Sequence, residues 1–260
     1  MIIRADPEYF NGGSIMNDEE KYLRARLAEL SERSRTRGIW TYSDFLSLYE
    51  QTLIPAGAVF QRIGGYDGAE RVMAAFGSED ELGYGPEPPV AVVRIAPVSA
   101  RFDAGMGHRD CLGALMALGI KRQCLGDIVL GEHEAYVICE DSVAAHICGQ
   151  LTSVGRTSVT CTAAGAVPGT LTPEPEERSV IVASVRIDAL VAAVYHLSRG
   201  EARTLFEREL VFCDGRLIDS PGYRPAPGSI VSVRGRGRFR FEEETGKTKK
   251  GNTVVLCRVW

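Results

Sequence analysis

Apolar residues recur at helical spacing between residues 187 and 206, which predicts two short helices. The first set is Ile187, Leu190, Val191, Val194 and Tyr195, and the second is Ala202, Leu205 and Phe206. Between the two sets, Ser198 and Glu201 have the spacing of a capping box, in which a hydroxyl and a carboxylate each bind a free amide at a helix start. The second helix is therefore expected to start at Ser198, which places Arg199 and Arg203 one turn apart on its solvent-facing side.

A hairpin and a third strand are predicted after these helices. Asp214-Gly215 separates the apolar runs 211–213 and 216–218, and this dipeptide favours a tight turn between two strands. Residues 229–233 form the next apolar run, which leads directly into arginines at every second position from Arg234 to Arg240. If the chain stays extended there, these arginines all point to one side.

The pattern before residue 180 predicts a helical N-terminal region and a mixed middle region. Helices are expected over 18–37 and over 41–53, the second capped by Ser43 or Thr41, whereas residues 1–16 are expected to be poorly structured. A strand over 58–63 follows. The apolar runs then predict strand 90–95, helix 110–118, strands 128–130 and 135–139, helix 142–151 and strand 157–162.

This βαββαβ order is typical of a ferredoxin-like or RRM-like layer of helices on an antiparallel sheet. The aromatic motifs of a true RRM are missing, so base stacking on this sheet is not expected. The fold class is therefore predicted as α+β. Three parts are expected, namely a helical region over 1–55, an RRM-like domain over 56–170 and a basic α/β module over 180–260.

Charge separates the last part of the chain from the rest. Residues 186–260 hold 14 Lys and Arg against 9 Asp and Glu, a net charge of +5, whereas the whole chain of 260 residues has −4. A basic module on an acidic chain is the expected footprint of contact with phosphates. The alternative is an ordinary small α/β module whose arginines only solvate its surface.

Composition favours a soluble protein, since 45% of the residues are hydrophobic and 25% are charged. No apolar run approaches the roughly 20 residues of a membrane span, and no secretory segment is recognised at the N-terminus. We therefore expect a cytoplasmic location and no membrane partner. The seven cysteines are scattered without a Cys-x-x-Cys pair, which argues against a zinc site and against a disulfide framework.

Residues 186–240 resemble the S4 RNA-binding domain, named after a protein of the small ribosomal subunit. The matching positions are Arg186, Asp188, Ser198, Arg199, Val211, Gly215, Gly228, Val231, Val233, Arg234 and Gly235. Two positions depart from the family pattern. Asp214 stands where an Asn usually precedes the hairpin glycine, and Ser229 stands where an Asp usually follows Gly228.

Three motifs in the middle region extend the resemblance to most of the chain. They are the stretches 64–71, 108–115 and 119–128, and a tail of the form Gly237-Arg238 … Thr248-Lys-Lys-Gly251 follows the S4-like region. Together they resemble the bacterial YlmH family over residues ~40–260. The resemblance implies a cytosolic RNA-binding protein that acts at the large ribosomal subunit, on stalled complexes carrying peptidyl-tRNA, in ribosome-associated quality control. Members of the family are also linked to cell division.

Enzymatic alternatives have less support in the sequence. S4 modules accompany RNA-modifying enzymes such as pseudouridine synthases, but there the module usually comes first and a large catalytic domain follows. His108, Arg109 and Asp110 at a helix start point to different faces, so capping and surface contact are favoured over catalysis. No enzyme activity, cofactor or metal is expected. A cell-division interaction factor and, less favoured, an RNA-modifying enzyme are the alternative functions.

Basic side chains of the S4-like region are the predicted RNA-binding residues. They are Arg186, Ser198, Arg199, Arg203, Arg234, Arg236, Arg238, Arg240, Lys249 and Lys250. A second RNA surface is predicted at Arg71, His108, Arg109, Lys121 and Arg122. The predicted partners are ribosomal RNA, transfer RNA and the large ribosomal subunit, and the protein is expected to be a monomer away from the ribosome.

Overall fold

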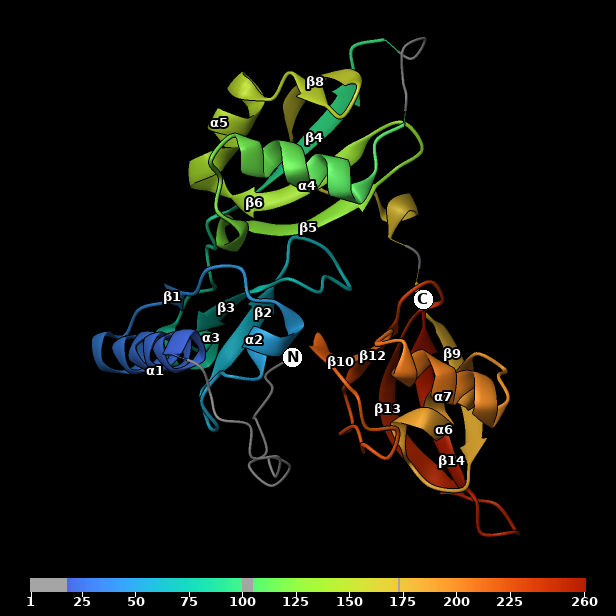
Figure 1. The fold of residues 1–260 in the computed structure, drawn as a ribbon. Helices are drawn as coiled ribbons and strands as arrows, with labels where there is room; N and C mark the ends of the chain where they lie inside the picture. The colour runs from blue at the N-terminus through green and yellow to red at the C-terminus, as the bar shows by residue number, and fades with distance from the viewer. Residues whose placement is uncertain (1–17, 100–104, 173) are drawn as a thin grey trace. The chain divides into compact units, whose positions relative to one another are not determined.

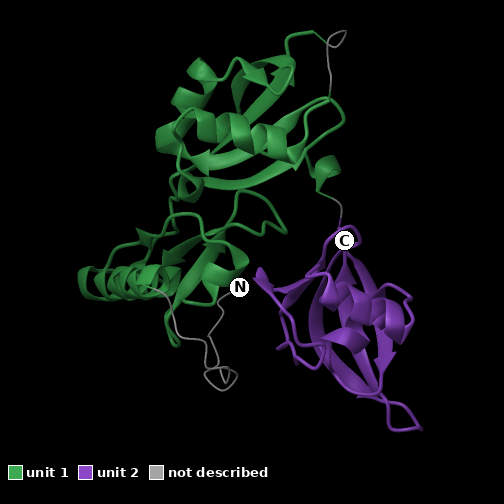
Figure 2. Cartoon of the chain, in the orientation of Figure 1, with its two compact units in different colours: residues 1–172 green, residues 173–260 purple. Residues whose placement is uncertain are grey.

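The computed structural model describes residues 18–99, 105–172 and 174–260, and the chain forms two units, residues 1–172 and 173–260 (Figure 2). The expectation about residues 1–16 lies outside the described part. Both units combine α-helices with antiparallel sheets, so the mixed α/β class is confirmed. The predicted division into 1–55, 56–170 and 180–260 stays a prediction.

Unit 1 begins with a helix on a three-stranded sheet (Figure 1). Helix α1 (Asp18–Arg37) is followed by β1 (Thr41–Tyr42), α2 (Leu48–Gln51), β2 (Phe60–Ile63), β3 (Met73–Phe76) and α3 (Glu79–Leu82), and the sheet has the order β1-β3-β2. Leu27 and Leu30 of α1 are buried with Phe60 and Phe76 of the strands. The sheet contains strands from both sides of residue 55, so the predicted boundary there falls within it.

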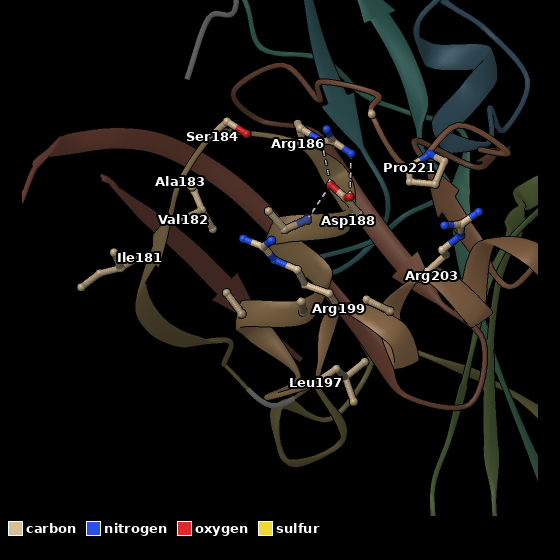
Figure 3. Close-up of a pocket in the computed structure, with 15 residues that line it drawn as sticks. Ile181, Val182, Ala183, Ser184, Arg186, Asp188, Leu197, Arg199, Arg203 and Pro221 are labelled. Carbon is tan, nitrogen blue, oxygen red and sulfur yellow. Dashed lines mark hydrogen bonds and ion pairs between the residues drawn. The ribbon is translucent and has the colours of Figure 1, made fainter. Parts of the chain in front are cut away.

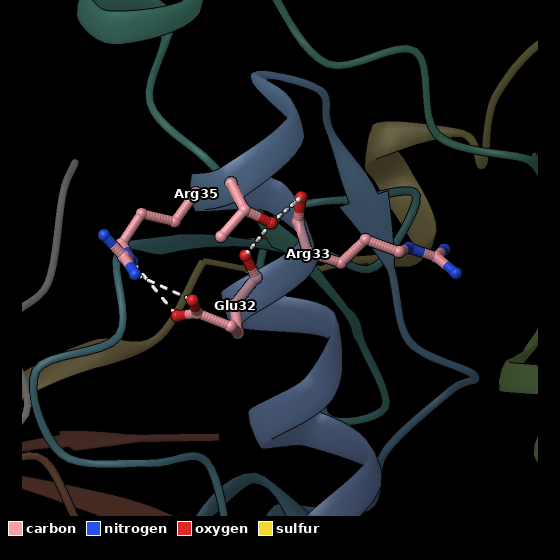
Figure 4. Close-up of polar contacts among 4 residues, drawn as sticks. Glu32, Arg33 and Arg35 are labelled. Carbon is pink, nitrogen blue, oxygen red and sulfur yellow. Dashed lines mark hydrogen bonds and ion pairs between the residues drawn. The ribbon is translucent and has the colours of Figure 1, made fainter.

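The exposed side of α1 carries its charges. Arg35 donates two hydrogen bonds to the carboxylate of Glu32 at 2.7 and 3.0 Å, and both side chains are exposed (Figure 4). This ion pair lowers the pKa of Glu32. An exposed pair of this kind contributes little to stability. The packing of the leucines therefore holds α1 in place, as their helical spacing predicts.

The predicted helix over 41–53 is wrong. Thr41 and Tyr42 pair with Phe76 and Ala75 of β3, and the helix begins only after Ser47. Ser47 and Glu50 form a capping box, since the Ser47 hydroxyl accepts from the Glu50 amide at 3.3 Å and the Glu50 carboxylate accepts from the Ser47 amide at 2.6 Å. The local pattern did not show that β3 offers a partner strand, and that pairing overrides helical periodicity.

The second part of unit 1 has a five-stranded antiparallel sheet. Its elements are β4 (Val90–Pro97), α4 (His108–Ala117), the 3-10 turn η3 (Arg122–Cys124), β5 (Leu125–Leu130), β6 (Ala135–Glu140), α5 (Asp141–Gln150), β7 (Ser153–Val154), β8 (Thr157–Ala164) and η4 (Gly169–Leu171). The strand order is β5-β6-β4-β8-β7. The helices and strands predicted over 90–162 are confirmed, with ends shifted by a few residues.

One face of this sheet packs on the helices, and part of the other face is covered by the rest of unit 1. Val93 and Val137 belong to the core shared with α4 and α5. Val92, Tyr136 and Ile138, on the opposite face, are buried with Phe45 and Met73 of the N-terminal part. The centre of the sheet is therefore closed on both sides.

Unit 2 is a six-stranded antiparallel sheet with two helices on one side (Figure 1). Its elements are β9 (Glu176–Val182), α6 (Ile187–Val194), α7 (Arg199–Glu207), β10 (Val211–Cys213), β11 (Arg216–Leu217), β12 (Ile230–Val233), β13 (Gly237–Lys247) and β14 (Thr253–Val259). The order is β11-β10-β12-β13-β14-β9. The two helices, the hairpin at Asp214-Gly215 and the strand β12 confirm the predictions. Strands β9 and β14 had not been predicted.

The Asp214-Gly215 hairpin has the backbone conformation that the sequence predicts. Asp214 and Gly215 have φ of 49° and 77°, so both central residues of the tight hairpin are left-handed. Asp214 also accepts a hydrogen bond from the amide of Ile230 at 2.8 Å. The Asp214 carboxylate thus ties the turn to β12.

Replacing Ser198 by alanine is expected to lower the stability of unit 2 by about 1 kcal/mol, or about 4–8 °C in its melting temperature. The Ser198 hydroxyl accepts from the amide of Glu201 at 3.3 Å, and the Glu201 carboxylate accepts from the amide of Ser198 at 2.8 Å. Hydrogen exchange at the first amides of α7 measures the effect. Ser220→Ala, at an exposed site outside the helices, is the control. If the first amides of α7 exchanged at the same rate in Ser198→Ala and in Ser220→Ala, the predicted contribution of the cap to stability would be contradicted.

Candidate nucleic-acid interface

Helices α6 and α7, together with the end of β9 and residues 221–222, bound an open groove of about 710 Å³ in unit 2. Three arginines line this groove. Arg186 directly precedes α6, Arg199 is the first residue of α7, and Arg203 follows one turn later. Figure 3 shows their side chains around the groove with Asp188 and Pro221. The structure thus brings together Arg186, Arg199 and Arg203, all predicted RNA-binding residues.

Small apolar side chains form much of the remaining lining. Ala189, Ala192 and Ala193 of α6 and Ala202 of α7 all lie along the groove. Since these side chains are short, the backbone of a ligand can approach both helices closely. The groove therefore combines cationic groups with a shallow, sterically open floor.

The three arginines differ in their intramolecular partners. Arg186 donates two hydrogen bonds to Asp188, at 3.0 and 2.7 Å, so its guanidinium is held in a fixed orientation. Arg203 lies 3.2 Å from Glu207, and this pair is exposed, with 76% of the Arg203 side chain accessible. Arg199 is exposed and makes no ion pair within residues 18–99, 105–172 and 174–260. Arg199 is therefore the groove arginine that forms no ion pair with a carboxylate of the described residues.

The prediction that residues 234–240 form one extended segment is wrong. Strand β12 ends at Val233, residues 234–236 form a turn, and β13 begins at Gly237. The Arg236 amide donates to the carbonyl of Val233 at 3.0 Å. Gly235 and Gly237 have φ of 80° and 108°, which side chains with a Cβ rarely adopt. The two glycines between the arginines therefore reverse the chain.

Because the chain reverses, the arginines between residues 234 and 240 lie partly in the turn and partly in β13. Arg238 and Arg240 alternate with the buried Phe239 and Phe241, which pack in the core with α6 and α7. The two arginines therefore point to the sheet face away from the helices. Arg236, in the turn, lies near Glu201, whose pKa is lowered mainly by the hydrogen bond from the Ser198 amide and to a smaller extent by the Arg236 charge.

Aromatic rings accompany the arginines on that face, and the sequence reasoning had missed them. The Arg234 guanidinium lies 4.5 Å from the ring centre of Phe212. Arg238 and Arg240 lie 5.1 and 5.6 Å from the ring of Trp260. Such distances are typical of cation–π contacts. Alternation along β10 could have indicated that Phe212 points outward, but its pairing with Arg234 depends on the fold.

Lys249 and Lys250 form a third group. They are exposed in the turn between β13 and β14, which is closed by a hydrogen bond from the Thr248 amide to the Asn252 carbonyl at 2.8 Å. Between them and Arg240, β13 carries the glutamates of residues 242–244. The predicted RNA-binding residues therefore do not form one continuous basic track.

In unit 1, Arg71 and Arg122 bind the backbone. Arg71 donates to the carbonyls of Leu125 at 2.9 Å and Phe45 at 2.8 Å, and Arg122 donates to Leu125 at 2.9 Å and Gly126 at 3.1 Å. Burial lowers the pKa of both guanidiniums, that of Arg122 to about 10. Both therefore have a structural role, and their contact with RNA stays a prediction.

Asp127 completes this arrangement and joins two of the sequence motifs. Its carboxylate accepts from the Tyr66 hydroxyl at 2.9 Å and from the amides of Glu70 and Arg71 at 2.7 and 3.2 Å. Burial raises the pKa of Asp127, although these hydrogen bonds and the charges of Arg71 and Arg122 oppose the shift. The motif at 64–71 and the motif at 119–128 thus form one polar cluster.

The other predicted residues of unit 1 lie at the surface. His108 and Arg109 are exposed in the first turn of α4, where Asp110 accepts from the Gly107 amide at 3.2 Å. Capping by Asp110 is therefore confirmed. Arg109 also lines a hollow of about 440 Å³ beside α4. Lys121 is exposed just before η3.

No group of three His, Cys, Asp or Glu side chains that could hold a metal ion occurs among the described residues. All seven cysteines are free. Burial raises the pKa of several of their thiols, that of Cys139 to about 12, which makes the thiolate form rare. In the same described ranges, every helix is too short or too polar to span a bilayer.

Comparisons with known proteins give the relationships of the chain. Residues 91–166 match a family described as "Putative RNA-binding domain in YlmH". The chain is 34% identical over 223 residues to "Ribosome-associated protein quality control protein P2" of Bacillus subtilis (strain 168), which covers 80% of this chain and 82% of that protein. A solved structure, "Cell division protein ylmH from Streptococcus pneumoniae", aligns with a TM-score of 0.45 and 15% identity, over 62% of this chain and 98% of that one. The extent of the similarity to the Bacillus protein, together with the matched domain, means that this chain belongs to the YlmH family.

Proposed function

We propose that this protein is a non-enzymatic RNA-binding factor that acts at the ribosome. The observation that carries the proposal is the convergence of Arg186, Arg199 and Arg203 at the groove between α6 and α7. Guanidinium groups bind phosphate oxygens through several hydrogen bonds, so such a cluster suits the backbone of a folded RNA. Contacts to phosphates do not depend on the base sequence, so the protein would recognise the shape of the RNA.

Unit 2 is the docking module in this proposal, and we assign it to the S4 type. The order of two helices, a tight hairpin and a Gly-rich strand connection supports the assignment, as do Arg186, Asp188, Ser198 and Arg199 at the positions expected from the motif. Its target would be a structured RNA of the large ribosomal subunit. The name of the Bacillus relative supports a role in ribosome-associated protein quality control, and we propose that the protein acts there on stalled complexes.

Unit 1 would provide a second RNA contact, with transfer RNA as a candidate. The matched domain at 91–166 is described as RNA-binding in its family, and its element order and sheet order support a ferredoxin-like arrangement. The exposed His108, Arg109 and Lys121 lie within that domain. Since the centre of the sheet is covered on both faces, we propose contact through these edge and helix-end residues.

Sedimentation of the tagged protein in cell lysate tests the proposed function. We expect co-migration with the large ribosomal subunit at low salt, and weaker co-migration as salt rises, because phosphate contacts release counterions. Arg199→Glu with Arg203→Glu is expected to move the protein to the top of the gradient. If the unaltered protein also stays at the top at both salt concentrations, the ribosomal role is rejected.

A further inference from the structure

The sheet face of unit 2 that points away from α6 and α7 carries a second cluster of arginines. Arg234 lies over Phe212, and Arg238 and Arg240 lie over Trp260. We call these five residues the sheet-face cluster. Arg234 is exposed and Trp260 is partly exposed. The cluster is thus accessible on the side of the sheet opposite to the groove.

Strand register places these side chains next to one another. Phe212 of β10 is opposite Ser232 of β12, and Ser232 is opposite Arg238 of β13. Arg240 is opposite Arg258 of β14, directly before Val259 and Trp260. Neighbouring strands are about 4.8 Å apart, so the cluster extends about 14 Å across four strands. That width is enough for a short stretch of an extended polymer.

The backbone holds Trp260 against β13. The Trp260 amide donates to the Arg238 carbonyl at 3.0 Å. A Cβ at Gly237 would lie 2.9 Å from the Trp260 carbonyl oxygen, so a glycine is needed for this approach. Main-chain contacts therefore hold the backbone of Trp260 beside β13, and its indole lies near the guanidiniums of Arg238 and Arg240.

This face carries four arginines together with carboxylates that pair with two of them. Arg258 lies 3.3 Å from Glu177 and 3.5 Å from Glu242, and Glu242 lies 3.9 Å from Arg240. Glu177 and Glu242 form ion pairs with Arg258 and Arg240 at the edge of the cluster, whereas Arg234 and Arg238 lie beside aromatic rings. A surface of this composition complements a polyanion that also carries flat, stackable groups.

We propose that the sheet-face cluster binds unpaired nucleotides of RNA. Bases would stack on Trp260 and Phe212, and the neighbouring phosphates would contact Arg234, Arg238 and Arg240. This combination of aromatic platforms and cationic groups is the general chemistry of single-strand binding. The inference rests on the proposed RNA-binding function and adds to it, because unit 2 then contacts folded RNA through the groove and an unpaired segment through its opposite face.

Tryptophan fluorescence of the full chain tests the proposal. The chain has two tryptophans, and Trp40 is buried, so quenching by a nucleic acid reports on Trp260. The probe is an oligoadenylate of eight nucleotides. We expect it to quench the emission of the original protein. Because substitution of Trp260 removes this signal, the affinity of each variant is measured by the fluorescence anisotropy of a dye-labelled octamer, and Trp260→Ala is expected to weaken binding about tenfold. Trp260→Phe keeps an aromatic ring and is expected to retain part of the affinity. Arg238→Ala is expected to reduce the salt slope by about one.

Controls separate this proposal from others. Arg208→Ala removes an exposed arginine at the end of α7 and is expected to leave octamer binding unchanged. Absence of quenching, or full affinity in Trp260→Ala, would overturn the sheet-face site. If ribosome co-sedimentation persists in that case, only this site is rejected and the proposed function stands. Equal quenching by an octaglutamate peptide would overturn the RNA assignment in favour of an acidic protein segment.

Discussion

Replacing Arg199 and Arg203 together by alanine is expected to weaken binding to large ribosomal subunits about 100-fold. Each guanidinium lies at the groove and is exposed, so each can contact one phosphate. We assign roughly tenfold, or about 1.4 kcal/mol, to each lost contact. The slope of log affinity against log salt is expected to become shallower by about one to two units. Binding of labelled protein to purified subunits at several salt concentrations measures both quantities.

The same double substitution is expected to leave the fold intact. Arg203 pairs only with the exposed Glu207 among the ion pairs described, and such pairs contribute little to stability. Arg208→Ala is the matched control, since Arg208 is the C-cap residue of α7 and does not line the groove. An unchanged salt slope in the double variant would remove both arginines from the RNA interface.

Replacing Asp127 by alanine is expected to destabilise unit 1 by about 3 kcal/mol, with a fall of about 6–12 °C in its melting temperature. The substitution removes the acceptor for the Tyr66 hydroxyl and for the amides of Glu70 and Arg71. It also removes the negative charge next to the partly buried guanidiniums of Arg71 and Arg122. Unsatisfied donors and an uncompensated buried charge are among the larger causes of destabilisation.

Hydrogen exchange followed by mass spectrometry can assign this effect to unit 1. Faster exchange is expected in the segments 64–76 and 125–140, whereas segments of unit 2 should exchange at the original rate. Asp127→Asn keeps an oxygen acceptor and is expected to lie between the original protein and Asp127→Ala. Asp67→Ala, at an exposed position between β2 and β3, is the control. A loss below about 0.5 kcal/mol in Asp127→Ala would contradict the proposed role of the cluster.

Several features of unit 2 were readable from the sequence because their causes are local. The capping box of Ser198 and Glu201 needs residues only three apart, and the Asp214-Gly215 turn needs only two residues that accept positive φ. Helical periodicity likewise placed Arg199 and Arg203 on the exposed side of α7. From these local causes Arg199 and Arg203 could be placed on an exposed helix face before the fold was known, whereas their assignment to RNA came from the family resemblance.

Features that depend on distant partners were missed or predicted wrongly. Residues 41–42 are a strand because β3, some 30 residues later, pairs with them. Strands β9 and β14 pair with each other across more than 70 residues, and neither had been predicted. Arg71 was predicted at an RNA surface, yet the carbonyls of Leu125 and Phe45 that bind it come from distant segments of the chain. No window of neighbouring residues contains these partners.

The sequence by itself determined the helices of unit 2, its hairpin, its basic charge and the family resemblance, because short-range hydrogen bonds, periodicity and composition are properties of the local chain. Only the tertiary structure decided which arginines share a face. Gly235 and Gly237 turn the chain between β12 and β13, so Arg238 and Arg240 join Trp260 on one side of the sheet while Arg199 and Arg203 lie on the other. The physical reason is that a change of chain direction, and the pairing of strands that follows from it, assigns each side chain to a face.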